Sequence, residues 1–481
     1  MTLDPADWDA TRDVAHRMVD DMLTYLRTVR ERPAWQPVPA DVAARLAAPI
    51  PREGEPLADV YAAFTRDVLP YPTGNIHPRF WGWVMGTGTP AGMLADMLAS
   101  GMNAHVAGYD QSAAIVERQV LSWLRELMGF PRDASGILVS GGTDANLNGL
   151  MAARVARAGF DILEEGLLAG PPLTVYGSTE THSWILKACA SMGLGRRAFR
   201  SVRVDAAYRV DVDACRDRIR ADMGAGMRPF AIVGNAGTVN TGAVDDLVAL
   251  RDLADEFGLW LHVDGAFGAL AAWSDHRGLV AGQERADSLA FDLHKWGYMP
   301  YEIGVSLTRD PDAQTATYQP TGAKPPAYLR SAEEGIATQT TYFADRGIQL
   351  SRGFRALKAW MSMKEQGTDR IGAAVGRNID QARRLARLVE DHPDLELLAP
   401  VSMNVVCLRY RGDAPDDRLD ALNHDILVAL QTRGIAVPSA TTLGGRFAIR
   451  VCITNHRSED ADFDLLVDRV AAIGDELAAR A

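Results

Sequence analysis

Short apolar segments alternate with helix-like segments between about residues 136 and 308, and this alternation constrains the fold more than any other feature. Each apolar segment has the length of a strand and is bounded by turn residues, which is typical of strands buried on both faces. Such strands, joined by helices, form a mostly parallel sheet covered on both sides, so the sequence predicts an α/β fold. The predicted strands are GILVS (136–140), LTVYGS (173–178), FAIVGNAG (230–237), LWLHVDGAFG (259–268), SLAFDL (288–293) and IGVSLT (303–308).

The predicted sheet lies in the middle one of three segments. Residues 1–75 contain an amphipathic helix at 6–31 and proline-rich linkers, and are too thin to bury both faces of their helices. We expect them to form an N-terminal helical arm that packs on the main body or on a second subunit. Residues 76–365 are the expected large domain, and residues 366–481 the expected small α+β domain. Within the large domain, residues 308–350 lose the alternation and predict a long loop, and loops of this length are usually functional lids or disordered.

Charge and composition exclude several classes of protein. The formal net charge of −12 argues against nucleic acids and anionic membrane surfaces as partners. No apolar run approaches the ~20 residues of a membrane span, and the polar N-terminus lacks a signal-peptide pattern. The four cysteines show no C-x-x-C spacing, which predicts buried reduced thiols and no metal site. We therefore expect a cytoplasmic protein.

A glycine-rich turn follows the first predicted strand. In SGILVSGGTDANLNGLMAAR (135–154), the residues Ser140 to Thr143 join that strand to a helix. Two glycines let the backbone approach a ligand closely, and the first N–H groups of the helix then point at it, which suits a phosphate. An ordinary β-to-α turn explains the same letters.

Polar residues follow three other predicted strands. Asp264 ends an apolar strand, where ligand crevices of open α/β sheets lie, and a carboxylate there can hold a proton on a ring nitrogen. His182 begins a helix and can stack on an aromatic ligand, while Asn235 lies in a glycine-rich turn. Each residue has a structural alternative: a helix cap for Asp264, a cap or core histidine for His182, and turn chemistry for Asn235.

Lys295 stands out because lysine is rare in this chain. There are 45 Arg and five Lys, and Lys295 lies in the apolar stretch FDLHKWGYMP (291–300). Arginine stays protonated, whereas a desolvated lysine can become a nucleophilic amine and form a Schiff base. Alternatively, its stem packs on Trp296 while its head reaches water. A phosphate turn, a stacking histidine, a strand-end aspartate and a lysine together suit one cofactor, pyridoxal 5′-phosphate.

Taken together, these motifs closely resemble those of the group II pyridoxal-phosphate-dependent decarboxylases, which include aromatic-L-amino-acid, histidine and glutamate decarboxylases. The resemblance spans about residues 60–365 and extends into the small domain. It is carried by HPRFWGWVMGTGTPAGMLADMLASGMN (77–103), SGGTDANLNGLMAAR (140–154), THSWILKACASMGLG (181–195), HVDGAFGA (262–269), DLHKWG (292–297), SRGFRALKAW (351–360) and GGRFAIRVCITN (444–455).

The resemblance implies a fold type I enzyme with a mostly parallel, seven-stranded sheet, an obligate homodimer with active sites at the subunit interface. It implies that Lys295 holds the cofactor as a Schiff base, Asp264 partners the ring nitrogen and His182 stacks on the ring. By matching motif positions, the cofactor-binding residues would be Ser140, Gly141, Gly142, Thr143, His182, Asn235, Asp264, Ala266, His294 and Lys295.

The implied reaction is loss of CO2 from an L-amino acid to give the amine. In the family, a tyrosine of a mobile loop is tied to protonation at Cα, and the matching region ATQTTYFADRG (337–347) offers Tyr342. A register shift of one residue would instead place Phe343 there. Phenylalanine at this position is associated in the family with an aldehyde product.

The sequence suggests a substrate class only weakly. Phe80 and Trp81 can line an aromatic pocket or pack in a core, whereas Asn103 and His105 fall where aromatic-specific relatives carry apolar side chains. Arg450 can pair with a carboxylate. An aromatic L-amino acid is the leading expectation, and an acidic or other polar amino acid follows. An aldehyde synthase or another fold type I lyase is the alternative activity.

Overall fold

The computed structural model describes residues 2–319, 334–338, 342–412 and 415–480. The chain divides into two compact units. The larger unit contains residues 84–386 and 399–407, and the smaller unit contains residues 1–83, 387–398 and 408–481. The expected boundaries at residues 75 and 365 stay predictions.

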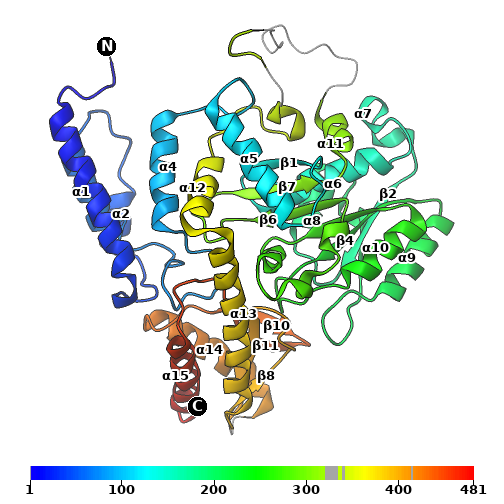
Figure 1. The fold of residues 1–481 in the computed structure, drawn as a ribbon. Helices are drawn as coiled ribbons and strands as arrows, with labels where there is room; N and C mark the ends of the chain where they lie inside the picture. The colour runs from blue at the N-terminus through cyan, green and yellow to red at the C-terminus, as the bar shows by residue number, and fades with distance from the viewer. Residues whose placement is uncertain (1, 320–333, 339–341, 413–414, 481) are drawn as a thin grey trace. The chain divides into compact units, whose positions relative to one another are not determined.

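The larger unit is built on a seven-stranded sheet with the strand order β1-β7-β6-β5-β4-β2-β3 (Figure 1). The pairs β2–β3, β2–β4, β4–β5 and β5–β6 are parallel, whereas β7 runs antiparallel to both β1 and β6. The predicted α/β fold with a mostly parallel sheet is therefore confirmed. The strands are β1 (Ser135–Val139), β2 (Leu173–Ser178), β3 (Phe199–Val202), β4 (Arg228–Asn235), β5 (Trp260–Asp264), β6 (Ser288–Asp292) and β7 (Gly304–Thr308).

Helices connect these strands: α6 contacts β1, β4, β5, β6 and β7, α9 contacts β2, β3 and β4, and α10 contacts β4 and β5. The larger unit also buries three free cysteines, Cys189, Cys215 and Cys407. Its helices are α4 (Pro90–Met102), α5 (Ser112–Leu127), α6 (Gly142–Arg157), α7 (Ile162–Glu165), α8 (Trp184–Ser191), α9 (Val212–Gly224), α10 (Leu247–Phe257), α11 (Pro311–Tyr318), α12 (Ala356–Gln366) and α13 (Thr368–Glu390), whose last residues belong to the smaller unit.

The expectation of a continuous loop over residues 308–350 is wrong at its two ends. Helix α11 begins directly after Asp310, whose carboxylate accepts hydrogen bonds from the backbone N–H groups of Asp312 and Ala313. Pro311 occupies the first turn, where its missing N–H costs nothing. A short 3-10 helix (Phe343–Arg346) closes the segment. Residues 320–333 and 339–341 of the expected loop lie outside the described residues.

A buried ion pair fixes the chain where this segment ends. The guanidinium of Arg352 pairs with Glu117 of α5, and both side chains are almost fully buried. The same guanidinium donates to the carbonyl of Val106 at 2.6 Å and to that of Leu138 in β1 at 2.8 Å. It also lies 4.9 Å from the ring centre of Phe343, which is fully buried. Arg352 therefore connects three separate segments of the larger unit.

The smaller unit combines both ends of the chain. Its four-stranded sheet has the order β10-β11-β9-β8, and Cys452, at the end of β11, is a buried free thiol. No described helix of the chain is long and apolar enough to cross a membrane. The elements of the smaller unit are α1 (Trp8–Arg27), α2 (Ala40–Leu46), α3 (Leu57–Asp67), β8 (Leu395–Leu397), β9 (Val405–Tyr410), whose first residues belong to the larger unit, α14 (Leu419–Thr432), β10 (Ser439–Leu443), β11 (Arg446–Cys452) and α15 (Asp460–Ala478).

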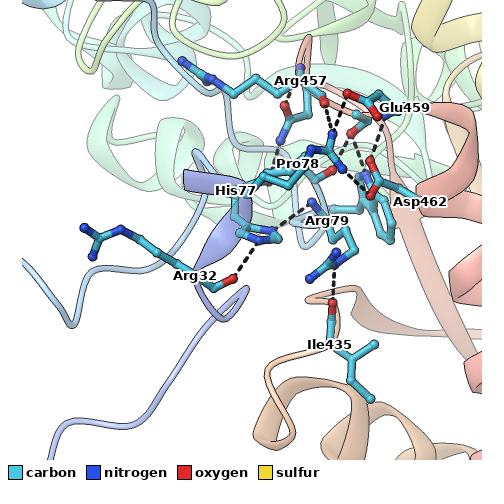
Figure 2. Close-up of polar contacts among 12 residues, drawn as sticks. Arg32, His77, Pro78, Arg79, Ile435, Arg457, Glu459 and Asp462 are labelled. Carbon is cyan, nitrogen blue, oxygen red and sulfur yellow. Dashed lines mark hydrogen bonds and ion pairs between the residues drawn. The ribbon is translucent and has the colours of Figure 1, made fainter. Parts of the chain in front are cut away.

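A polar network holds the two ends of the chain together within the smaller unit (Figure 2). Arg30 pairs with Asp462 at 2.8 Å and with Glu459 at 3.1 Å. His77 shares a hydrogen bond with the carbonyl of Arg32, and Arg79 donates to the carbonyl of Ile435 at 2.7 Å. Burial lowers the pKa of His77 to about 4. The N-terminal residues are thus part of the unit that contains the C-terminal helices.

Candidate functional site

The glycine turn after β1 lies against the segment that carries the unusual lysine. A Cβ added to Gly142 would lie 2.8 Å from Oδ2 of Asp292 and 3.5 Å from Cβ of Ala266. A Cβ added to Gly141 would lie 3.2 Å from Cε1 of His294. Only glycine fits this close approach at position 142 without a shift of its neighbours. The turn, which the sequence suggested as a phosphate site, is therefore packed directly on Asp292 and His294.

Asp264 lies at the carboxyl end of β5 and is buried. Its Oδ2 accepts a hydrogen bond from Nε1 of Trp184 at 2.6 Å, and its Oδ1 accepts one from the N–H of Ala266 at 3.1 Å. Both donors hold the carboxylate in a fixed orientation. The sequence analysis did not single out Trp184. Its position two residues after His182, in the segment that follows β2, was the signal that could have identified it.

Lys295 forms an ion pair inside the site. Its Nζ lies 2.8 Å from Oδ2 of Asp292, which is completely buried, while the lysine side chain is 22% exposed. Burial alone would lower the pKa of Lys295, but the Asp292 carboxylate outweighs it and holds the pKa above its ordinary value. In this state the amine therefore carries a proton, and the nearest acceptor for that proton is Asp292.

His294 lies between the turn and the lysine. Its Nδ1 lies 3.1 Å from the backbone nitrogen and 3.0 Å from the carbonyl oxygen of Ile303, and Nε2 lies 3.8 Å from Oδ2 of Asp292. Burial lowers the pKa of His294, against the opposing field of Asp292. The ring of Tyr301 lies 4.3 Å away, centre to centre. A neutral imidazole thus faces the glycine turn.

His182 and Asn235 lie at the ends of neighbouring strands. Nδ1 of His182 accepts a hydrogen bond from the N–H of Trp184 at 3.2 Å, and its ring is exposed at the site. Loss of hydration lowers the pKa of His182, although the field of Asp264 acts in the opposite direction. Asn235 pairs in register with Asp264 and donates to Oδ2 of Asp245 at 2.8 Å.

Three other predicted residues of the larger unit, Asn103, His105 and Tyr342, lie on or next to segments other than the strand ends. Asn103 ends α4 in the left-handed conformation, with a φ of 46°. Nδ1 of the exposed His105 accepts a hydrogen bond from the N–H of Arg352 at 3.4 Å. Tyr342 is half-buried and directly precedes Phe343, whose N–H donates to the carbonyl of Ala107 at 2.7 Å.

Phe80, Trp81 and Arg450 belong to the smaller unit. Trp81 is buried, stacks on Phe463 at a centre distance of 5.0 Å and donates to Oγ of Ser458. Phe80 is buried as well, and Arg450 donates to the carbonyl of Trp83 at 2.7 Å. Core packing accounts for the burial of Trp81, and the assignment of these residues to a substrate pocket stays a prediction.

The residues that meet at the strand ends fit pyridoxal 5′-phosphate. A lysine amine follows β6, a carboxylate ends the neighbouring β5, and the Gly141–Gly142 turn after β1 packs against Asp292 at the end of β6, as a Schiff base, a ring nitrogen and a phosphate require. Comparison with known families agrees: the model for the "pyridoxal-dependent decarboxylase conserved domain" matches residues 39–411. The chain belongs to this family.

Full-length relatives support the assignment. This decarboxylase is 31% identical to an aromatic-L-amino-acid decarboxylase of Bacillus atrophaeus over 97% of this chain and 96% of the relative. It is also 31% identical to an L-2,4-diaminobutyrate decarboxylase of Rhizobium meliloti (strain 1021), over 89% and 84% of the two chains. A crystal structure of Oryza sativa TDC with PLP and tryptamine superposes with a TM-score of 0.89 and 26% identity, covering 99% of this chain and 100% of that one.

These findings confirm the fold type I architecture, the pyridoxal-phosphate cofactor and the amino-acid decarboxylase activity. The relatives carry different substrate names, so they leave the choice of amino acid open.

Proposed function

We propose that this decarboxylase converts an aromatic L-amino acid to its amine and CO2, with Lys295 as the residue that binds the cofactor covalently. The observation that carries the proposal is the placement of the lysine amine against a buried carboxylate at the strand end next to Asp264. The similarity to an aromatic-L-amino-acid decarboxylase over nearly the whole of both chains supports the substrate class.

Each residue of the cluster has a proposed task. When bound, the cofactor supplies a ring that accepts the electron pair left by the departing CO2. Asp264, oriented by Trp184, keeps a proton on the ring nitrogen, which makes that ring a stronger acceptor. His182 covers one ring face and Ala266 the other. The turn Ser140–Thr143 holds the phosphate, with the neutral imidazole of His294 beside it.

Lys295 would hold the cofactor as a Schiff base, and its amine would have to be unprotonated for that bond to form. The carboxylate of Asp292, 2.8 Å from Nζ, stabilises the protonated amine and raises its pKa, so Asp292 opposes the loss of this proton. Capture of the cofactor is therefore proposed to be favoured as the pH rises.

Tyr342 is our candidate for the group that delivers a proton to Cα of the product. The alternative register, with Phe343 in this role, is opposed by the contacts of Phe343, whose ring is fully buried beneath the guanidinium of Arg352. We propose the amine, rather than an aldehyde, as the product for this reason. We further propose that the enzyme is a cytoplasmic homodimer, with residues 1–75 contributing to the subunit contact.

A polar amino acid is the second candidate substrate. The exposed side chains of Asn103 and His105 and the equal identity to an L-2,4-diaminobutyrate decarboxylase favour it. The test is incubation of the cofactor-loaded enzyme with each amino acid separately, with CO2, amine and aldehyde followed by mass spectrometry. An aromatic amine in equal amount with CO2 is expected. Turnover of a diamino or acidic substrate alone would refute the aromatic class, and an aldehyde with ammonia and peroxide would refute the Tyr342 assignment.

A further inference from the structure

A buried histidine that has no part in the proposed chemistry is connected to the glycine turn. His262 of β5 is fully buried, and its Nε2 lies 2.7 Å from Oδ1 of Asn146 in α6. Asn146 in turn donates from Nδ2 to the carbonyl of Gly142 at 2.7 Å. On the other side of the ring, Nδ1 lies 2.7 Å from Oγ of Ser288, which accepts from Nε1 of Trp260 at 2.8 Å.

The hydrogen bonds around His262 take their direction from the groups at the two ends of the series and from the neutral state of the ring. An indole N–H can only donate and a carbonyl can only accept. Because the amide of Asn146 donates to Gly142 from Nδ2, its Oδ1 accepts from Nε2 of His262. Burial lowers the pKa of His262 to about 4, so the ring is neutral with its proton on Nε2, and Nδ1 accepts from the hydroxyl of Ser288.

Close packing shows that helix α6 is seated on this histidine. A Cβ added to Gly149 would lie 2.7 Å from Nδ1 of His262 and 2.9 Å from Oγ of Ser288. Glycine at position 149 therefore permits the helix backbone to approach the ring. The helix begins at Gly142, so the same contact that seats α6 also places the turn at its first residue.

The bond to Gly142 also sets the direction of the next peptide N–H. In a planar trans peptide the C=O and N–H point in opposite directions. When Asn146 holds the carbonyl of Gly142 along the helix, the N–H of Thr143 is directed back toward the turn. This N–H is one of the groups at the start of the helix that have no partner within it and are available to a phosphate.

We propose that His262 is a positioning residue for the phosphate turn, acting through Asn146 on the peptide that follows Gly142. The inference rests on the proposed placement of the cofactor phosphate at residues 140–143. It deepens that proposal, because it makes a core histidine two residues before Asp264 responsible for the phosphate-specific part of cofactor affinity. Asp264 and the turn would thereby be set by one strand, β5.

Two histidine variants separate the role of the Nε2 bond from the loss of the ring. In His262→Asn the side-chain amide occupies the position of Nδ1 and cannot reach Asn146. In His262→Gln the amide nitrogen occupies the position of Nε2 and can donate to Asn146. The dissociation constants of pyridoxal 5′-phosphate and of pyridoxal are measured for the cofactor-free protein, and their ratio isolates the phosphate because both compounds carry the same aldehyde and ring.

The expected result is a loss of about tenfold in the preference of His262→Asn for the phosphorylated compound, as the net loss of one buried hydrogen bond predicts. His262→Gln should recover most of this preference. Asn146→Ala, which leaves the imidazole in place, should lose it to the same degree and serves as the test if His262→Asn does not fold.

Asn148→Ala is the matched control. Asn148 is buried on the same helix, but its side chain bonds to Gln314, Ser306 and the carbonyl of Arg346, away from the turn. This variant should be less stable but should keep the preference for pyridoxal 5′-phosphate over pyridoxal. If the folded variants His262→Asn and Asn146→Ala also keep this preference, the positioning role of His262 is refuted. If the unaltered enzyme itself shows no preference, the placement of the phosphate at the turn fails instead.

Discussion

The buried neutral His262 makes the larger unit sensitive to acid. Burial lowers the pKa of this imidazole from 6.5 to about 4, against the opposing field of Asp264. As the pH falls, His262 therefore becomes protonated near pH 6.5 in the unfolded chain but only near pH 4 in the folded protein. Stability contributed by the neutral ring is fully present above pH 6.5 and is lost as the pH falls. From these two values, the loss between pH 7.5 and pH 5 is about 2 kcal/mol, and at most about 3 kcal/mol at lower pH.

The assay compares urea unfolding of the cofactor-free protein at pH 7.5 and pH 5 with that of His262→Gln. Glutamine does not titrate, so the variant should be less stable at pH 7.5 but should lose about 2 kcal/mol less on acidification. His77, in the smaller unit, also makes the fold less stable in acid, but it does so equally in both proteins. Its contribution therefore cancels when the pH dependence of one protein is subtracted from that of the other. Equal pH dependence in the two proteins would show that His262 takes up its proton at the same pH in the folded and unfolded states, and the neutral ring assigned to the folded protein at pH 5 would be wrong.

Three further substitutions test other contacts. Asp292→Asn removes the charge that raises the pKa of Lys295, so capture of the cofactor should extend to lower pH in a stopped-flow pH profile; an unshifted profile would contradict the ion pair. Gly142→Ala places a Cβ 2.8 Å from Oδ2 of Asp292 and should weaken cofactor binding at least about tenfold in a titration, whereas unchanged affinity would show that the turn can move freely. Glu117→Ala leaves the buried guanidinium of Arg352 without its carboxylate and should cost about 3–5 kcal/mol in thermal unfolding; a cost below about 1 kcal/mol would show that the pair contributes little.

The sequence predicted the sheet well because the signal for each strand is local. The strand LTVYGS, for example, is observed over the predicted residues 173–178, since glycine and polar residues bound an apolar run at both ends. The same locality placed Asp264 at the end of β5 and Lys295 just after β6, and the parallel pairing of these two strands brings them together. The glycine turn follows β1, so its approach to Asp292 depends on packing across the intervening antiparallel strand β7.

The sequence could not predict contacts that depend on three-dimensional packing. Asn146 reads as an ordinary polar helix residue and His262 as part of an apolar strand, and their bond joins residues 116 positions apart. The sequence also could not predict that residues 1–83 and residues 408–481 belong to one compact unit. Arg30 and Asp462, which join them, are 432 positions apart and neither lies in a recognisable motif. Helix α11 was missed because residues 308–350 lose the alternation of strands and helices, and the helix cap formed by Asp310 and Pro311 was not considered.

The central claim is that Lys295 binds the cofactor covalently, and the rarity of lysine makes this claim easy to test. The cofactor-loaded enzyme is reduced with borohydride, digested, and searched by mass spectrometry for a lysine that carries the pyridoxyl group. Five lysines are available: Lys187, Lys295, Lys324, Lys358 and Lys364. The account predicts a stoichiometric adduct on Lys295 that disappears in Lys295→Ala. A stoichiometric adduct on any of the other four lysines, with Lys295 unmodified, would contradict it.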